Sequence, residues 1–365
     1  MRILLVICGY LVLLGCQPSA LSAQSDQNAA SAHRVQSEEL HTLKEGEERL
    51  QSQQQKRSFK TALKNAVSSS GLYINQIQFV GSHNSYKQAM PESFVKQLLQ
   101  LNPKVLASLQ YEHGPLGEQL DLGMRKLELD VFYVAEENQF LVGHVQQIDM
   151  NSNCATLRIC LTQVRAWSKN NPSHAPIWIS FNAKDEYILG LRAPEVFTAE
   201  AFALMDSIIE EVLGIQLIRP IEVAGLNWPL LREARGKFLM ILDQGGSKRD
   251  MYYQGWQKRP MFTDAPEGHP AAAIMILNEP LEKFDEIKRL VTAGYMVRTR
   301  ADADTREARE NDTKRRDAAF ASGAQAISTD YYLPATQFGN DYQVILPQAI
   351  RCNPVTAPAN CQAFE

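Results

Sequence analysis

Short apolar runs recur along the chain from residue 71 onward, and stretches of helical character separate them. Seven of these runs have the length and composition of strands: 77–80, 127–133, 177–181, 238–242, 273–277, 295–299 and 326–329. Strands that alternate with helices predict a parallel sheet with crossover helices. Because the first strand is not followed by Gly-x-Gly-x-x-Gly, the pattern favours an α/β fold of the (β/α)8 TIM type, regular or distorted, over a dinucleotide-binding sheet. Charge-dense residues 305–320 predict one solvated outer helix, capped by Asp304 with Glu307 three residues later.

The N-terminal 70 residues differ in composition from the rest. Residues 1–15 combine Arg2 with an apolar run too short for a stable membrane span, which is typical of a signal peptide. The end of this run resembles the lipobox of bacterial lipoproteins, which predicts cleavage before Cys16 and lipid on its sulfur; an ordinary secretory signal is the alternative. Polar residues 16–70 predict a tether, partly helical or disordered, ahead of a folded domain at 71–365. We therefore expect a lipid-anchored protein of the bacterial cell envelope, on the outer membrane or facing the periplasm.

Composition narrows the class of partner. Hydrophobic residues make up 45% of the chain and charged residues 21%, which excludes wholesale disorder. With 37 basic and 41 acidic residues the formal charge is −4, so no overall positive field exists to hold a nucleic acid. We expect a monomer.

Four cysteines follow the export signal as two close pairs, Cys154 with Cys160 and Cys352 with Cys361. Two local disulfides in an oxidising compartment are the simplest interpretation. A zinc site made of four thiolates is the alternative, but it is disfavoured because no Cys-x2-Cys spacing is present.

Polar residues fall at the carboxyl ends of three predicted strands. Residues two apart on a strand share a face, which groups Glu128 with Asp130, Asn182 with Lys184, and Arg298 with Arg300 and Asp302. In a barrel these ends form the catalytic rim, so the inward faces are expected to carry chemistry. Structural ion pairs along the rim remain an alternative for each group.

The most specific motif is Gly-Ser-His-Asn-Ser-Tyr at 81–86, directly after the first strand, and a second histidine follows at Gly143-His144. Together with Leu-Glu-Leu-Asp-Val-Phe at 127–132, Val-Arg-Thr-Arg-Ala-Asp at 297–302 and the string at 322–330, this order resembles the calcium-dependent phosphoinositide-specific phospholipase C family, in its bacterial and fungal single-domain branch. The resemblance covers residues 73–334.

The resemblance implies that His83 and His144 are the catalytic pair and that Asn84, Glu128 and Asp130 bind Ca2+. It implies cleavage of phosphatidylinositol or a related inositol phosphodiester by attack of the inositol hydroxyl. Such a reaction needs an acid, a base and positive charge near phosphorus, and hard oxygen ligands suit Ca2+. His144 is assigned as the general acid. His83 is expected to hydrogen-bond the phosphoryl oxygen, and whether it or a carboxylate takes the hydroxyl proton stays open.

Further contacts to the phosphate or inositol are expected from Lys184, Arg298 and Arg300, with rim salt bridges as the alternative. Asn182 stands where the family has an acidic ligand; its oxygen can still coordinate, but we expect weaker calcium binding. A glycerophosphodiester phosphodiesterase is a second candidate function, disfavoured because His83 is followed by Asn and not Arg. A lipid-binding lipoprotein with weakened turnover is the third. The substrate could be the membrane lipid, a glycosylated anchor or a soluble diester.

Overall fold

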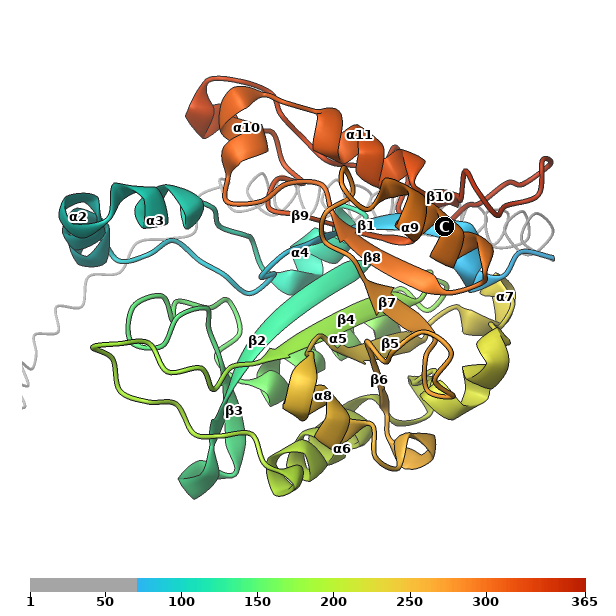
Figure 1. Ribbon diagram of the computed structural model, residues 1–365, viewed down its shortest axis with the longest axis horizontal. Helices are drawn as coiled ribbons and strands as arrows, with labels where there is room; N and C mark the ends of the chain where they lie inside the picture. The colour runs from blue at the N-terminus through green and yellow to red at the C-terminus, as the bar shows by residue number, and fades with distance from the viewer. Residues whose placement is uncertain (1–70) are drawn as a thin grey trace, which may run out of the picture. The chain divides into compact units, whose positions relative to one another are not determined.

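The computed structural model describes residues 71–365. The predicted signal peptide, the lipidated Cys16 and the tether lie outside these residues. Within them, eight strands form one parallel sheet in the order β6-β5-β4-β2-β1-β9-β8-β7 (Figure 1). Their bounds are β1 (Ile77–Ser82), β2 (Lys126–Val134), β4 (Ile177–Ala183), β5 (Phe238–Leu242), β6 (Met261–Thr263), β7 (Ile274–Ile276), β8 (Met296–Arg300) and β9 (Ala326–Thr329).

The sheet curls into a TIM-type barrel that is open at one seam. The two ends of the strand order, β6 and β7, are three residues each, and no ladder between them is found in the part of the chain that the structure describes. The segment that joins them, residues 264–273, is irregular where other crossovers carry helices. The predicted (β/α)8 architecture is therefore confirmed in its distorted form.

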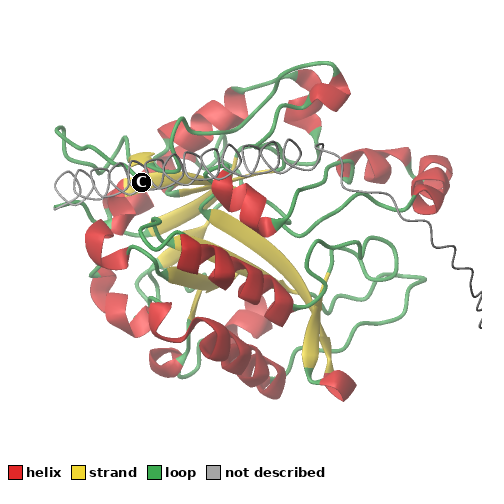
Figure 2. Cartoon of the chain, turned by 180° about the vertical axis from the view of Figure 1, so that it is seen from behind, coloured by secondary structure: helices red, strands yellow, loops and turns green. Residues whose placement is uncertain are grey.

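Helices surround the strands on the outside of the barrel (Figure 2). They are α2 (Glu92–Leu101), α3 (Pro103–Ser108), α4 (Leu116–Asp121), α5 (Leu157–Asn170), α6 (Ala199–Leu213), α7 (Leu231–Ala234), α8 (Gly246–Tyr252), α9 (Phe284–Thr292), α10 (Arg306–Glu310) and α11 (Lys314–Ala321). Short 3-10 helices occupy Ile74–Gln76, Ala135–Glu137, Gly214–Gln216, Pro220–Leu226, Trp256–Lys258 and Thr336–Phe338. No helix among residues 71–365 is both long and apolar enough to cross a membrane.

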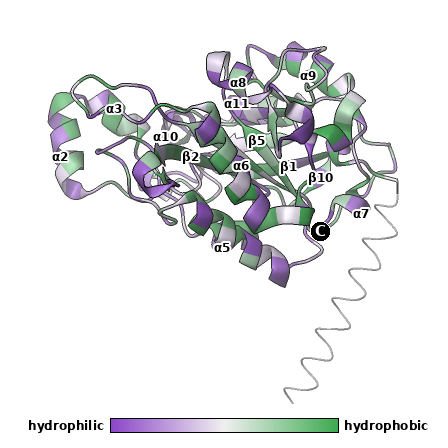
Figure 3. Ribbon diagram, turned by 90° about the horizontal axis from the view of Figure 1, so that it is seen from below, coloured by the Kyte–Doolittle hydropathy of each residue, from purple (hydrophilic) through white to green (hydrophobic). Residues whose placement is uncertain are grey.

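The crossover helices form where the chain supplies caps and an apolar stripe. The Thr156 side chain accepts a hydrogen bond from the Ile159 backbone N–H and begins α5, and Thr198 begins α6 in the same way. Helix α6 buries six residues against the barrel, while α2 buries none and lies away from the strands with α3 (Figure 1). Hydrophobic and hydrophilic residues alternate along the surrounding helices (Figure 3).

Alternation along the strands divides the two faces of the barrel wall. The odd-numbered residues of β2 and β4, such as Leu129 and Ile179, pack outward against the helices. The even-numbered residues face the barrel interior, where Trp178 of β4 lies against Phe79 of β1 with ring centroids 6.4 Å apart. Phe79 and Trp178 belong to an apolar layer at the amino ends of the strands. The polar inward residues lie at the carboxyl ends, as the sequence predicts.

Two additional strands extend the sheet. Strand β3 (Gln139–Val142) runs antiparallel to the second half of β2, and β10 (Arg351–Cys352) pairs antiparallel with the start of β1. Sequence analysis does not predict β3, β6 or β10, which are two to four residues long. The β2–β3 hairpin has a direct consequence for the site, since His144 follows β3.

The prediction of one helix over 305–320 is wrong. Two helices, α10 and α11, replace it, and Asn311 between them adopts a left-handed backbone conformation with φ 51°. Asp304 does not cap α10; Thr305 holds that position, with φ 62°, and Glu307 instead accepts a hydrogen bond from the Ala303 backbone N–H at 2.9 Å. Asn tolerates the left-handed region better than most residues, which allows the break.

Both predicted disulfides are present. Cys154 and Cys160 join the segment after β3 to the first turn of α5, with Cα atoms 5.1 Å apart. Cys352 and Cys361 close a loop near the C-terminus, with Cα atoms 6.1 Å apart. The alternative of a four-thiolate zinc site is therefore wrong.

Candidate active site

The candidate residues meet at the carboxyl ends of the barrel strands. His83 and Asn84 follow β1, which approaches β2 closely because residue 81 is glycine: a Cβ there would lie 2.0 Å from the Lys126 carbonyl oxygen. Asn84 then turns the chain with φ 46°, a conformation that asparagine adopts more readily than most residues. The Gly-Ser-His-Asn motif thus combines a close strand approach with a sharp turn into the site.

His83 is held by a buried aspartate. Its Nδ1 lies 2.8 Å from Oδ1 of Asp330, which follows β9, and its Nε2 lies 3.7 Å from Oε1 of Glu128. Burial, and next the nearby Arg300 guanidinium, hold the pKa of His83 well below its usual value. A neutral imidazole that donates from Nδ1 to Asp330 leaves the Nε2 lone pair free toward the site.

His144 has the same kind of partner in a different setting. It follows β3, its side chain is 19% exposed, and its Nδ1 lies 3.2 Å from Oδ2 of Asp149. Asp149 is fully buried and forms an ion pair with Lys87 at 3.2 Å. The ring is therefore oriented from its Nδ1 side, and its Nε2 is the atom left for a substrate.

A second carboxylate supports Asp330. The Asp330 backbone N–H donates to Oδ1 of Asp302 at 2.8 Å, and Thr329 Oγ1 donates to Oδ2 of Asp302. Burial and the proximity of Asp330 raise the pKa of Asp302 to about 7. Arg300 lies between these groups, 3.6 Å from Oδ2 of Asp330 and 3.4 Å from Nδ1 of His83.

Glu128 is held by two buried cations. Lys126 Nζ contacts its Oε2 and also donates to the Ser82 carbonyl at 3.0 Å, and Arg298 Nη2 donates to the same Oε2 at 2.7 Å. The pKa of Glu128 is well below its usual value because the charges of Lys126 and Arg298 outweigh the cost of burial. The pKa of Lys126 falls to about 8 through burial. Arg298 is thus a buried ion-pair partner, the arrangement that the salt-bridge alternative describes.

Asn182 and Lys184 face inward, so the register assumed from the sequence is confirmed. Asn182 Nδ2 donates to Glu128 Oε1 at 3.1 Å and to Asp130 Oδ1 at 2.9 Å. Lys184 Nζ lies 3.0 Å from Asp130 Oδ2, with its side chain 29% exposed. Asp130 is therefore shared between an amide and an ammonium group, and Lys184 remains within reach of a ligand.

The residues present fit a calcium site with few negatively charged ligands. Asn84 Oδ1 is buried and has no hydrogen-bond partner among residues 71–365, although Asn84 Nδ2 donates to Tyr111 Oη at 2.7 Å. This free oxygen and the carboxylate oxygens of Glu128 and Asp130 are the kind of hard donors that Ca2+ prefers. Across the described part of the chain, no group of three or more His, Cys, Asp or Glu side chains is arranged to hold a metal. With Asn at 182, the donor set is two carboxylates and amide oxygens.

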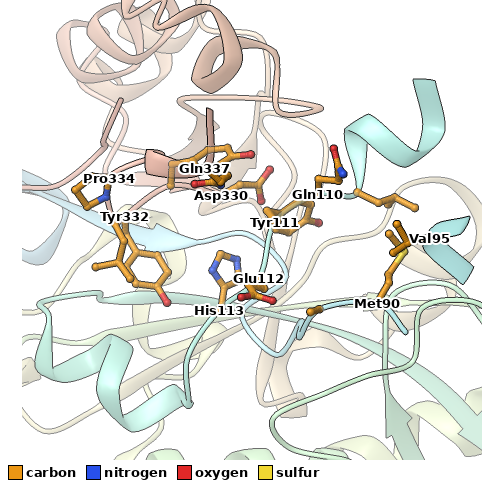
Figure 4. Close-up of a pocket in the computed structure, with 14 residues that line it drawn as sticks. Met90, Val95, Gln110, Tyr111, Glu112, His113, Asp330, Tyr332, Pro334 and Gln337 are labelled. Atoms are coloured by element: carbon orange, nitrogen blue, oxygen red, sulfur yellow. The ribbon is translucent and has the colours of Figure 1, made fainter. Parts of the chain in front are cut away.

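Two cavities open beside the site. One of about 400 Å³ lies next to Asp330 and His113, between Tyr332 and Pro334 on one side and Met90 and Val95 on the other (Figure 4). The second, of about 330 Å³, is lined by His144 and Lys184 together with residues of the segment after β4. His144 lines the second cavity, and Asp330, the partner of His83, lines the first.

Sequence reasoning missed four charged residues of this site, which are Lys87, Lys126, Asp149 and Asp330. Lys126 could have been predicted, because the same alternation rule places it on the inward face of β2 with Glu128 and Asp130. Asp330 ends a string used for the resemblance but had no assigned role. Its contact with His83 spans 247 positions of sequence, which no local pattern reports.

Comparisons with known proteins agree with this geometry. The family model described as "Phosphoinositide phospholipase C, Ca2+-dependent" matches residues 72–140 and 134–354. A calcium-dependent phosphoinositol-specific phospholipase C from Pseudomonas sp. superposes with TM-score 0.51 at 16% identity, over 78% of this chain and 96% of that one. A Ca2+-dependent phosphatidylinositol-specific phospholipase C from Streptomyces antibioticus gives TM-score 0.50 at 18% identity, over 72% and 96%. No curated protein sequence matches the chain. At these identities the solved structures show the shared fold.

Proposed function

The chain belongs to the Ca2+-dependent phosphoinositide phospholipase C family of phosphoric diester hydrolases, whose cofactor is calcium, and we propose that it cleaves an inositol phosphodiester by attack of the adjacent ring hydroxyl on phosphorus. The observation that carries this proposal is the pair of histidines at one rim, each held through Nδ1 by a buried aspartate. Acid–base cleavage of a diester needs two such groups with free Nε2 atoms.

His83 is the base in this proposal. Its lowered pKa keeps it neutral near pH 7, so Nε2 can accept the hydroxyl proton. The nearby carboxylates are poorer bases, because Glu128 is held by Lys126 and Arg298, and Asp130 by Lys184. This argument favours His83 over a carboxylate, a choice that the sequence leaves open.

His144 is the acid. As the new bond from the ring oxygen to phosphorus forms and the bond to the alcohol oxygen breaks, the protonated imidazole gives its Nε2 proton to the departing alkoxide. Asp149 accepts from Nδ1 throughout and stabilises the charged ring. Ejection of an alkoxide without a proton is slow, so this transfer is expected to contribute about 10²- to 10⁴-fold.

Positive charge around the phosphate comes from this chain and from calcium. Lys184 and Arg300 are both partly exposed and lie at opposite sides of the site, where they can bind phosphate oxygens. Calcium, held by Asn84, Glu128, Asp130 and Asn182, would act as a Lewis acid on the phosphate. Because three cations already contact the two carboxylates, we expect the calcium affinity to be modest.

The decisive experiment measures release of cyclic inositol phosphate from phosphatidylinositol and from soluble glycerophosphoinositol, in calcium and in chelator. We expect calcium-stimulated release that His83→Ala and His144→Ala abolish. His269→Ala is the matched control, because this histidine lies between β6 and β7. Cleavage of glycerophosphoglycerol or glycerophosphocholine at equal rates would favour the glycerophosphodiester phosphodiesterase instead, and binding of inositol lipid without turnover would favour the weakened lipoprotein.

We propose further that the enzyme is a lipid-anchored monomer of the bacterial cell envelope. The support is the sequence alone: an apolar segment that ends in Leu-Leu-Gly-Cys16, followed by a polar tether. Cys16→Ser should move the full-length protein from the membrane to the soluble fraction. Unchanged membrane association would contradict anchoring through Cys16.

A further inference from the structure

Lys87 is a buried cation between the two loops that carry the histidines. It lies four residues after His83, and its side chain is only 1% exposed. Its Nζ is 3.2 Å from Oδ2 of Asp149, the same oxygen that lies 3.2 Å from Nδ1 of His144. Lys87 is too deeply buried to bind substrate directly, so its effect must pass through Asp149.

The Asp149 carboxylate depends on these two partners. It is fully buried, and its other oxygen, Oδ1, has no hydrogen-bond partner within residues 71–365. A buried carboxylate without a compensating charge favours its neutral form or moves toward water. Lys87 supplies a permanent compensating charge, since His144 must lose its positive charge once in every catalytic cycle.

The backbone of Lys87 connects the same parts of the molecule. Its N–H donates to the Asn84 carbonyl at 2.9 Å, and its carbonyl accepts from the His113 N–H at 2.8 Å. Lys87 also forms an isolated antiparallel bridge with Ser152, in the segment that follows His144. The loop of His83 and the loop of His144 are therefore joined at this one residue by both main chain and side chain.

We propose that Lys87 is a positioning residue for the general acid: it keeps Asp149 ionised, so that neutral His144 carries its proton on Nδ1 and presents Nε2 to the leaving group. A protonated Asp149 would instead donate to Nδ1 and leave the only ring proton of neutral His144 on Nε2. The imidazolium that delivers its Nε2 proton to the alkoxide would then have no carboxylate at Nδ1 to stabilise its charge. The inference rests on the proposed role of His144 as acid.

Lys87→Met tests the inference with two substrates, an inositol phosphodiester with an alkyl alcohol leaving group and one with an acidic phenol. We expect kcat to fall roughly 10- to 100-fold for the alkyl substrate, less than the full value of an acid, and to change little for the phenol. Lys87→Arg should recover most of the loss. Lys96→Met, which removes an exposed lysine, is the matched control. Equal losses on both substrates would overturn the proposal.

A spectroscopic readout separates this inference from the proposed function. In 15N-labelled protein the nitrogen shifts of neutral His144 should report the Nδ1–H tautomer in wild type and the Nε2–H tautomer in Lys87→Met. If Lys87→Met does not fold, Asp149→Asn should show the same tautomer change and the same dependence on leaving group. An unchanged tautomer would overturn the role of Lys87 even if the enzyme is active, whereas absence of turnover by wild type would overturn the proposed function and leave the tautomer test standing.

Discussion

The two histidine–aspartate pairs share their geometry and differ in what lies behind each aspartate. Behind Asp330 there is a second carboxylate, Asp302, with Arg300 alongside. Behind Asp149 there is an ammonium group, that of Lys87. His83 follows the central strand β1, whereas His144 follows the short hairpin strand β3, and their side chains are 15% and 19% exposed.

This difference separates acid from base within one site. Burial and the Arg300 charge favour the neutral form of His83, which suits a base. His144 lines a cavity, which suits a group that must be reprotonated after each turnover. Two similar pairs can therefore take opposite roles because their surroundings differ, a common pattern in acid–base enzymes. The experiments below test that division of roles.

The largest effect is expected from removing each imidazole in turn. His83→Ala should lower turnover about 10²- to 10⁴-fold for alkyl and phenol leaving groups alike, because the hydroxyl must be deprotonated in both cases. His144→Ala should lose as much on the alkyl substrate but little on the phenol, which departs without a proton. Steady-state kinetics on both substrates measure this. The reverse pattern would exchange the roles, and equal losses for His144→Ala would remove it as the acid.

Asp302, which lies near His83, makes the free energy of unfolding depend on pH. Its pKa of about 7 lies above the value near 4 expected when unfolded, so between these values the folded state binds more protons. Stability is therefore highest below about pH 4 for this group and falls as pH rises toward 7, by at most about 1.4 kcal/mol per pH unit. Asp302→Asn imitates the protonated form and should flatten that slope in chemical denaturation curves.

The control for Asp302 is Asp304→Asn, an exposed acid two residues away. This substitution should leave the slope of stability against pH unchanged. If Asp302→Asn also leaves this slope unchanged, Asp302 is ionised throughout this pH range. The contrast between the carboxylate behind Asp330 and the ammonium group behind Asp149 would then have no electrostatic consequence.

Removing each disulfide in turn tests whether turnover depends on the position of the loop that carries His144. Removing either Cys154–Cys160 or Cys352–Cys361 should lower the free energy of unfolding by about 2 kcal/mol, since both close short loops. Only the first bond anchors the segment that carries His144 and Asp149. We expect the Cys154→Ser/Cys160→Ser variant alone to lose turnover of the alkyl substrate below its melting temperature. Full activity of both variants would show that β3 and Lys87 suffice to place the loop.

The sequence predicted most of this site because its signals are local. Strand alternation gave the inward faces of Glu128, Asp130, Asn182 and Lys184, and the structure confirms them. The supporting charges could not be predicted in the same way. Asp330 meets His83 only because β9 lies beside β1 in the barrel, and the strand order is a property of the whole fold.

The fold, too, was predicted best where the signal in the sequence is local. Long apolar strands such as β5 were predicted to the residue, because their hydrophobic run is continuous. Strand β7 was predicted, but the three-residue strand β6 at the other side of the open seam was not, and its pairing depends on β5 already being in place. The break between α10 and α11 depends on the left-handed conformation of Asn311, which competes with a charge pattern typical of one helix.

The smallest expected effect is on the affinity for calcium beside His83. Asn182→Glu adds a negative oxygen between Glu128 and Asp130, where the amide now donates to both. The gain in attraction for Ca2+ is offset by dehydration and by repulsion between three carboxylates, so we expect about tenfold tighter binding, or about 1.4 kcal/mol. Calorimetric titration with Ca2+ measures this without turnover. Asn182→Ala should weaken binding, and Asn170→Glu, an exposed position at the end of α5, should leave it unchanged. If neither substitution at 182 shifts the titration, Asn182 is not a ligand, and the ion contacts only the Asn84 side of the site.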